Sequence, residues 1–127
     1  MRSFAITVVA GVVSLVGCGG AMSPSYGGGG GGCTPTATKV CLANTAYNPG
    51  TLTIMHGTTV TWQNADTYGH SVTSATGSPD TYDSGTIAGG GTFSHLFATA
   101  GTYSYYCYIH GANGTPPTGM HASITVN

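Results

Sequence analysis

The segment T51-L-T-I-M-H-G-T-T-V-T-W62 decides the fold class of this chain. Its two ends, Leu52–Ile54 and Val60–Trp62, place apolar residues at every second position. Such alternation is typical of strands that bury one face and expose the other. His56-Gly57-Thr58 lies between the two runs and indicates a turn. The segment therefore predicts two consecutive strands joined by a turn.

The rest of the chain from Cys33 onward continues this pattern. It is rich in Thr, Val and Tyr, is broken by Gly at short intervals, and shows no helical period. Such a run of short strands with tight turns predicts an all-β sandwich or barrel. Ala100-Gly101-Thr102-Tyr103 is typical of a tyrosine corner, in which the Tyr hydroxyl bonds to upstream backbone in a Greek key. Further strands are expected at Val40–Leu42, His70–Ser74, Thr92–Phe97, Thr102–Cys107 and Met120–Val126.

Residues 1–17 have the composition of a signal peptide. Arg2 supplies a positive charge, and the apolar run after it is shorter than the roughly 20 residues that a membrane-spanning helix needs. The run closes on Leu15-Val16-Gly17-Cys18, which resembles a bacterial lipobox, where the chain is cut before a cysteine that is then acylated. The alternative is ordinary secretion with cleavage a few residues later. Both interpretations export the protein to an oxidising compartment, the periplasmic side of the cell envelope.

Residues 18–32 are expected to contain the lipidation site and a flexible linker. The segment includes an unbroken run of six glycines and lacks the side chains needed to build a core. We therefore expect a folded domain at 33–127 that is tethered to a bacterial membrane through acylated Cys18.

Charge is nearly absent from the expected mature chain. Lys39 is its one base, against Asp66, Asp80 and Asp83, which leaves a net charge of −2. No basic patch is available to hold phosphates, which argues against nucleic acid as a partner. The shortage of carboxylates also argues against a hydrolase that works with a pair of them.

The number of cysteines in the exported domain is odd once Cys18 is acylated or removed. Cys33 and Cys41 flank seven residues at the N-terminal edge of the domain and suit a local disulfide. In the chain-entropy model this bridge would stabilise the fold by about 2.5 kcal/mol. Cys107 is then a leftover thiol, which needs a reason in an oxidising compartment. An inert buried Cys107, or a disulfide from Cys107 to Cys33 or Cys41, is the alternative.

The C-terminal segment gathers donor atoms that suit a metal ion. Cys107, His110, Met120 and His121 lie within fifteen residues of one another. The two-residue gap between Cys107 and His110 lets one tight turn present sulfur and imidazole to a common point. A thiolate, imidazoles and a weak thioether form the ligand set of an electron-transfer copper site, with a trigonal plane of two His and one Cys and a long axial Met. A zinc site would not use Met. One further His is required from elsewhere in the fold.

A series of short segments in fixed order carries a family resemblance. They are YNPGTLTI (47–54), GTTVTWQNAD (57–66), His70-Ser71-Val72, Phe93–Phe97, GTYSYYCYIH (101–110) and Gly119-Met120. Each segment alone is weak, whereas all of them in this order are specific. From Val40 to Val126 the chain thus resembles the plastocyanin-like cupredoxins.

The resemblance implies an eight-stranded Greek-key β-sandwich that transfers single electrons through one type 1 (blue) copper ion. Carried over residue by residue, it makes His70, Cys107 and His110 the strong ligands and Met120 the weak axial ligand.

Two features depart from the family pattern. Gly69 and Ser71 flank His70 where family members often have Pro and Asn, so the hydrogen bonds that hold the sulfur are expected to differ. Nine residues separate His110 from Met120, where plastocyanins have four. Strand parity still favours Met120, which would face inward together with Ala122, Ile124 and Val126.

The remaining histidines are expected to have no part in this site. His56 in its turn and His121 on the outward face of the last strand are expected to be solvated. His95 shares strand parity with Phe93 and Phe97 and is expected to be partly buried, with a second metal site as the alternative.

The chain is therefore predicted to be an exported, monomeric electron carrier and not an enzyme. Its expected partners are a redox protein donor and acceptor, for example a cytochrome or a membrane oxidoreductase. A copper-binding or copper-delivery protein is one alternative, which would need an open, exchangeable site. A non-metal β-sandwich surface lipoprotein, with Cys107 in a disulfide, is the other.

Overall fold

The computed structural model describes residues 32–127. The predicted signal peptide, Cys18 and the linker up to residue 31 lie outside the described residues. Strands are the only regular elements of the described part, which confirms the predicted all-β fold. They are β1 (Lys39–Ala43), β2 (Ala46–Asn48), β3 (Thr51–Ile54), β4 (Thr58–Asn64), β5 (Thr73–Ser74), β6 (Thr92–Phe97), β7 (Gly101–Ala112) and β8 (Thr118–Val126).

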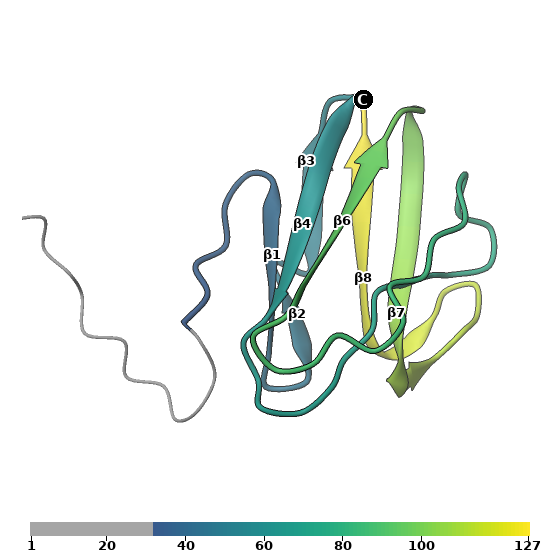
Figure 1. Cartoon of the computed structure of the whole chain (residues 1–127). Coiled ribbons are helices and arrows are strands. Elements are labelled where there is room, and N and C mark those ends of the chain that lie inside the picture. Colours follow the sequence, from purple (N-terminus) through teal and green to yellow (C-terminus); the bar gives the residue numbers. More distant parts are fainter. Residues whose placement is uncertain (1–31) are drawn as a thin grey trace, which may run out of the picture.

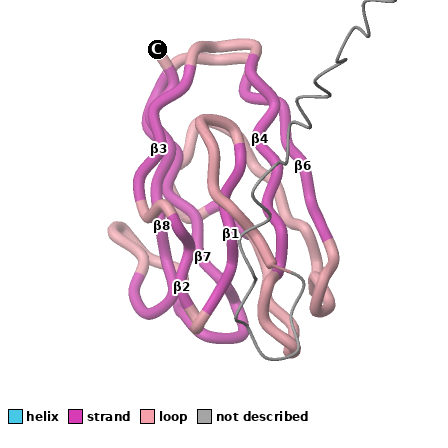
Figure 2. The backbone as a smooth tube through the Cα atoms, turned by 90° about the vertical axis from the view of Figure 1, so that its left-hand side faces the viewer, coloured by secondary structure: helices cyan, strands magenta, loops and turns pink. Residues whose placement is uncertain are grey.

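The eight strands form two four-stranded sheets that pack face to face (Figures 1 and 2). One sheet has the order β2-β1-β4-β6 and the other the order β3-β8-β7-β5. The pairs β1–β4 and β3–β8 are parallel, and the other pairs are antiparallel. The chain changes sheet at Pro49-Gly50, between the end of β2 and the start of β3. Sequence-distant strands are thus neighbours, as in the predicted Greek-key sandwich.

Alternation along the strands creates the core between the sheets. On β8, Met120, Ala122, Ile124 and Val126 are buried while His121 is exposed, so the predicted parity is confirmed. Trp62 of β4 is fully buried at the centre of the core. Its ring packs against those of Phe93, Phe97, Tyr82 and Tyr105, with ring centroids 5.6–6.3 Å apart.

The tyrosine corner and the local disulfide are both present. The hydroxyl of Tyr103 donates to the carbonyl of Thr99 at 2.7 Å, which closes the corner that leads into β7. Cys33 and Cys41 form a disulfide with a Cα–Cα distance of 5.8 Å, and Cys107 is a buried free thiol. The bridge ties the start of the described residues to β1.

Within residues 32–127, no helix is long and apolar enough to cross a membrane.

Two strand predictions need correction. A strand at Ala46–Asn48 was not expected, because three residues are too few to show an alternating pattern. The prediction of a strand over His70–Ser74 is wrong for its first part, since only Thr73–Ser74 is a strand. The amide of Ser71 donates to the sulfur of Cys107 and that of Val72 to the hydroxyl of Ser84, so these amides do not join a ladder.

Candidate metal centre

Two of the predicted ligands lie on a bulge in β7. Tyr106 pairs with His121 and Gly111 pairs with Gly119, so residues 107–110 of β7 lie opposite Met120 alone. Extra residues on one strand bend it and re-aim its side chains, and such bulges recur at functional sites. The prediction that Cys107 ends a strand is therefore wrong. The strand runs on to Ala112, and a bulge takes the place of the expected tight turn.

The long connection between His110 and Met120 is a hairpin that extends β7 and β8 beyond the bulge. Gly111 pairs with Gly119 and Ala112 with Thr118, which restores the ladder next to the site. Gly119 has a φ of 72°, and a Cβ placed on it would lie 2.6 Å from the carbonyl oxygen of His110. Glycine is needed there because the two backbones come too close for a side chain. The nine residues thus leave Met120 buried in the core, opposite the bulge.

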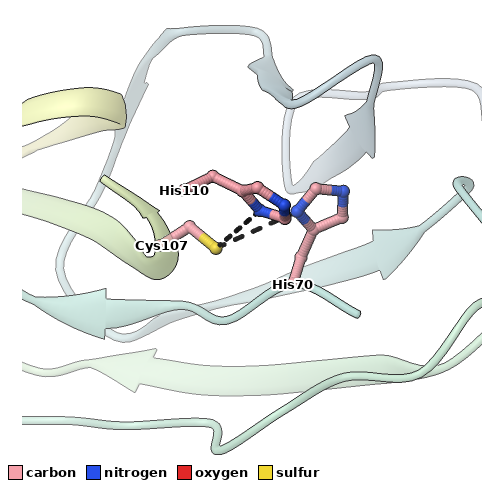
Figure 3. Close-up of side chains that lie close together, drawn as sticks. All are labelled: His70, Cys107 and His110. Atoms are coloured by element: carbon pink, nitrogen blue, oxygen red, sulfur yellow. Dashed lines mark hydrogen bonds between the residues drawn. The ribbon is translucent and has the colours of Figure 1, made fainter. Parts of the chain in front are cut away.

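His70 reaches the same point from the segment between β4 and β5. Its ring is fully buried, and its Nε2 lies 2.8 Å from Oδ2 of Asp66. That contact leaves Nδ1 facing Cys107, with 3.9 Å between Nδ1 and Sγ. The Nδ1 of His110 lies 3.5 Å from the same sulfur, and Figure 3 shows the three side chains converging.

The spacing of these donor atoms fits one metal ion. The three donor atoms lie within 4.8 Å of one another. Two donors bound at roughly 2.0 and 2.3 Å to a first-row metal ion in a trigonal plane are about 3.8 Å apart. The observed sulfur–nitrogen distances of 3.5 and 3.9 Å bracket this value. A soft thiolate with two imidazoles suits copper, because zinc sites of this kind add further Cys or carboxylate ligands.

Ser71 holds the sulfur in place. Its backbone N–H donates to Sγ of Cys107 at 3.3 Å, and its hydroxyl accepts the N–H of Tyr108 at 3.0 Å. Its carbonyl accepts the hydroxyl of Tyr47, whose burial raises the phenol pKa and keeps the proton on the donor. These are the hydrogen bonds that a serine makes at the position where family members often have Asn. One serine ties the His70 segment to the bulge through both its backbone and its side chain.

Asp66 contacts the predicted ligand His70, and sequence patterns alone do not identify this contact. Besides contacting His70, its carboxylate accepts the backbone N–H groups of Asn44 and Thr45 at 3.0 and 3.3 Å. Those two residues form the β1–β2 turn and have φ values of 54° and 58°. Burial alone would raise the pKa of Asp66, but hydrogen bonds from Asn44, His70 and Thr45 outweigh it and lower the pKa. One feature of the sequence could have indicated this contact: Asp66 lies four residues before the predicted ligand His70, in a chain with only three carboxylates.

We expect the stabilisation from Asp66 to depend on pH. Its pKa in the folded protein lies below its ordinary value of 3.8, so the stabilisation is complete above about pH 4 and is lost as pH falls through the folded pKa. Asp66→Asn should lower the free energy of unfolding of the metal-free protein by about 2 kcal/mol at pH 7, because a charged acceptor is lost. The difference from wild type should shrink below about pH 4.

Urea unfolding of the two metal-free proteins at several pH values measures this difference. Asp80→Asn is the control, because Asp80 is exposed and its carboxylate contacts only the half-buried His95 at 3.0 Å and the N–H of its neighbour Thr81 at 2.8 Å. Its effect should stay under about 1 kcal/mol. A gap between wild type and Asp66→Asn that is constant from pH 7 to pH 3 would contradict the assignment.

The other histidines lie outside this cluster, as expected. His121 is exposed, with Nδ1 2.8 Å from the carbonyl oxygen of Gly119, and His56 is exposed in the β3–β4 turn. His95 is half-buried, with its ring between those of Tyr82 and Phe97. Within residues 32–127, only His70, Cys107 and His110 form a group of three such side chains that could hold a metal ion.

Solved structures of copper proteins resemble this one. An oxidised variant of amicyanin is 26% identical, with a TM-score of 0.62 over 75% of this chain and 86% of that one. A purple cupredoxin from Nitrosopumilus maritimus is 28% identical, with a TM-score of 0.58 over 71% of this chain and 99% of the other. A copper-containing nitrite reductase from Thermus scotoductus SA-01 shares the fold at 24% identity, with a TM-score of 0.60. The match covers 75% of this chain but only 23% of the reductase chain.

A comparison with curated protein sequences finds no match. The family model described as copper binding proteins, plastocyanin/azurin family, matches residues 35–127. That range contains both sheets, the bulge and every donor atom described above. The chain therefore belongs to the plastocyanin/azurin family of copper-binding proteins.

Proposed function

We propose that this protein carries single electrons between redox proteins on a type 1 copper ion held by His70, Cys107, His110 and Met120. One observation carries the proposal. The buried sulfur of Cys107 and two imidazole Nδ1 atoms converge with trigonal spacing at a bulge, in a protein of the plastocyanin/azurin family of copper-binding proteins. Copper supplies the change of one electron between its Cu(I) and Cu(II) states.

The surrounding residues suit electron transfer because they keep the donor atoms fixed. Asp66 orients His70, the N–H of Ser71 bonds the sulfur, and the cross-strand pairing of Gly111 with Gly119 holds the far side of the bulge. A site that changes little in shape when its charge changes has a low reorganisation cost, since its dipoles are already oriented. Burial of the sulfur also argues against the copper-delivery alternative, which needs an open, exchangeable site.

Visible absorption and EPR of the full-length protein loaded with Cu(II) test the proposal. We expect an intense visible band from sulfur-to-copper charge transfer, together with the narrow copper hyperfine splitting of a type 1 site. A colourless complex with ordinary splitting would show that copper does not bind as a type 1 ion, and the copper-binding or copper-delivery alternative would then be preferred.

The thioether of Met120 is proposed as the weak axial ligand. Its burial in the core opposite the bulge supports the assignment. Because the axial ligand tunes the reduction potential, Met120→Gln should keep the visible band but shift the potential measurably. Cyclic voltammetry of the two copper-loaded proteins measures the shift, with His121→Gln on the exposed face of the same strand as the control. An unchanged potential and spectrum in Met120→Gln would remove Met120 from the ligand set.

The surface around His110 is the proposed contact with redox partners. His110 is the one half-buried member of the cluster. The exposed ring of Tyr68 contacts its ring, and exposed Ile109 precedes it in the chain. Tyr68 and Ile109 add no charged group to this surface, so docking there should depend little on electrostatic steering. Electron-transfer rates with the partner should therefore change little between low and physiological ionic strength, and a steep dependence would point to another surface.

We also propose that the protein is anchored to a bacterial membrane at the cell envelope. The lipobox Leu15-Val16-Gly17-Cys18 supports acylation, and the glycine-rich segment that follows would let the domain move about its anchor. Mass spectrometry should find a mature N-terminus at Cys18 that carries acyl chains, with the protein in the membrane fraction. An unmodified N-terminus beyond Cys18 would mean a carrier exported without an anchor.

A further inference from the structure

The ring of Tyr68 lies against both ligand histidines. Its centroid is 5.1 Å from that of His70 and 5.7 Å from that of His110, in edge-to-face geometry. The two histidine rings are themselves 4.8 Å apart, so the three rings form one cluster. Tyr68 is 45% exposed, whereas His70 and Cys107 are completely buried. Tyr68 is therefore the most exposed of the three rings, and it packs against both ligand rings.

Tyr68 is held in this position at both its ends. Its hydroxyl lies 3.1 Å from the hydroxyl of Thr45 in the β1–β2 turn, which Asp66 also fixes. Its carbonyl accepts the side-chain N–H of Asn64 at 2.8 Å, and Asn64 is fully buried. A ring held by its hydroxyl and by two aromatic contacts, on a backbone fixed by Asn64, has little freedom to swing away.

Exchange of the metal requires at least one ligand to move. Cys107 and His70 are fully buried and tied to Ser71 and Asp66, and Met120 is in the core. His110 is the half-buried ligand, which makes it the ligand that can open. Its ring cannot turn outward without losing the edge-to-face contact with Tyr68.

We propose that Tyr68 is a positioning residue that holds the two ligand imidazoles together and thereby sets how fast copper enters and leaves the site. This inference rests on the proposed function, because it takes copper as the metal that the site holds. It assigns to Tyr68 no bond to copper and no part in the electron-transfer step.

The experiment compares Tyr68→Ala with Tyr108→Ala in the full-length protein. Tyr108 is a matched control, because it is 43% exposed and its hydroxyl lies 2.7 Å from that of Thr86. Among residues 32–127, however, its ring makes no aromatic contact with His70 or His110. Truncating either tyrosine removes a similar exposed ring and a similar hydroxyl pair. Alanine at position 108 keeps the backbone N–H that bonds Ser71, so the variants differ chiefly in the lost ring contact with the ligands.

Two rates are measured by stopped-flow absorption. One is the uptake of Cu(II) by the metal-free protein, and the other is the loss of Cu(I) from the reduced protein to an excess of chelator. Tyr68→Ala should raise both rates about tenfold, which corresponds to two aromatic contacts of ordinary strength. Tyr108→Ala should leave both rates within about twofold of wild type. Tyr68→Phe keeps the ring but loses the Thr45 contact, and should give a rise of about threefold.

A second readout uses the metal-free protein alone. The NMR signals of the His70 and His110 rings should broaden or shift in Tyr68→Ala and stay unchanged in Tyr108→Ala, because only the first variant frees the ligand rings. The positioning role would be overturned if Tyr68→Ala had the copper-exchange rates and NMR signals of wild type. It would also be overturned if Tyr108→Ala changed them as much as Tyr68→Ala does. If Tyr68→Ala does not fold, Tyr68→Phe decides by the same two readouts. A wild-type protein that gives no blue spectrum would instead overturn the proposed function itself.

Discussion

Cys107→Ser is expected to abolish the intense visible band of the copper-loaded protein. The band arises from electron density moving from a thiolate sulfur to copper, and Cys107 supplies the one free thiol of residues 32–127. A serine hydroxyl is a neutral and harder donor, which suits copper poorly. The backbone N–H of Ser71 would also lose the sulfur it donates to. Copper bound by the remaining imidazoles should give a weak spectrum with ordinary EPR splitting.

The disulfide offers a control with the same chemical change. Cys33→Ser combined with Cys41→Ser also removes sulfur, but from the edge of β1 and not from the cluster of His70 and His110. This double variant should keep the visible band and lose about 2.5 kcal/mol of stability, as expected for a bridge that closes a short loop. A blue band in Cys107→Ser would require another sulfur ligand and would overturn the site.

Trp62→Ala is expected to lower the free energy of unfolding by about 3–5 kcal/mol, the usual cost of removing a large buried aromatic ring. The side chain is fully buried and packs against four other aromatic rings. Domains of this size have a total stability of only about 5–15 kcal/mol. A substantial fraction of the metal-free variant should therefore be unfolded at physiological temperature.

Urea unfolding followed by circular dichroism measures the loss. Leu96→Ala is the control, because Leu96 is a large apolar side chain that is exposed on β6, and its effect should stay within about 0.5 kcal/mol. Copper should raise the stability of Trp62→Ala, since a ligand that binds only the folded state stabilises it by mass action. A loss below about 1 kcal/mol for Trp62→Ala would contradict the placement of Trp62 at the centre of the core.

The same core supports the metal centre through a chain of contacts. The ring of Trp62 packs against that of Tyr105 at 5.6 Å, and Tyr105 packs against Tyr47 at 4.8 Å. The hydroxyl of Tyr47 then donates to the carbonyl of Ser71, whose N–H bonds the sulfur of Cys107. Loosening Trp62 should therefore weaken copper binding as well as folding.

The amino-acid sequence by itself determined the fold class and, with the family resemblance, predicted the candidate ligands. Alternation in segments such as Leu52–Ile54 and Val60–Trp62 requires two-faced strands, because one face must be buried and the other solvated. Cys107 and His110 lie three positions apart in the chain, so the sequence already predicted that their donor atoms would come close together. The parity of Met120 followed from the period of two along β8.

The tertiary structure decided how those donors meet. The bulge at residues 107–110 depends on the register between β7 and β8, which the pattern of one strand does not contain. The contact of Asp66 with His70 and the β1–β2 turn, and the placement of Tyr68 over two ligand rings, join segments brought together by the sandwich. Periodic patterns specify which face of a strand is buried. They do not specify which side chains from other strands arrive at the same point, because that is set by how the whole chain packs.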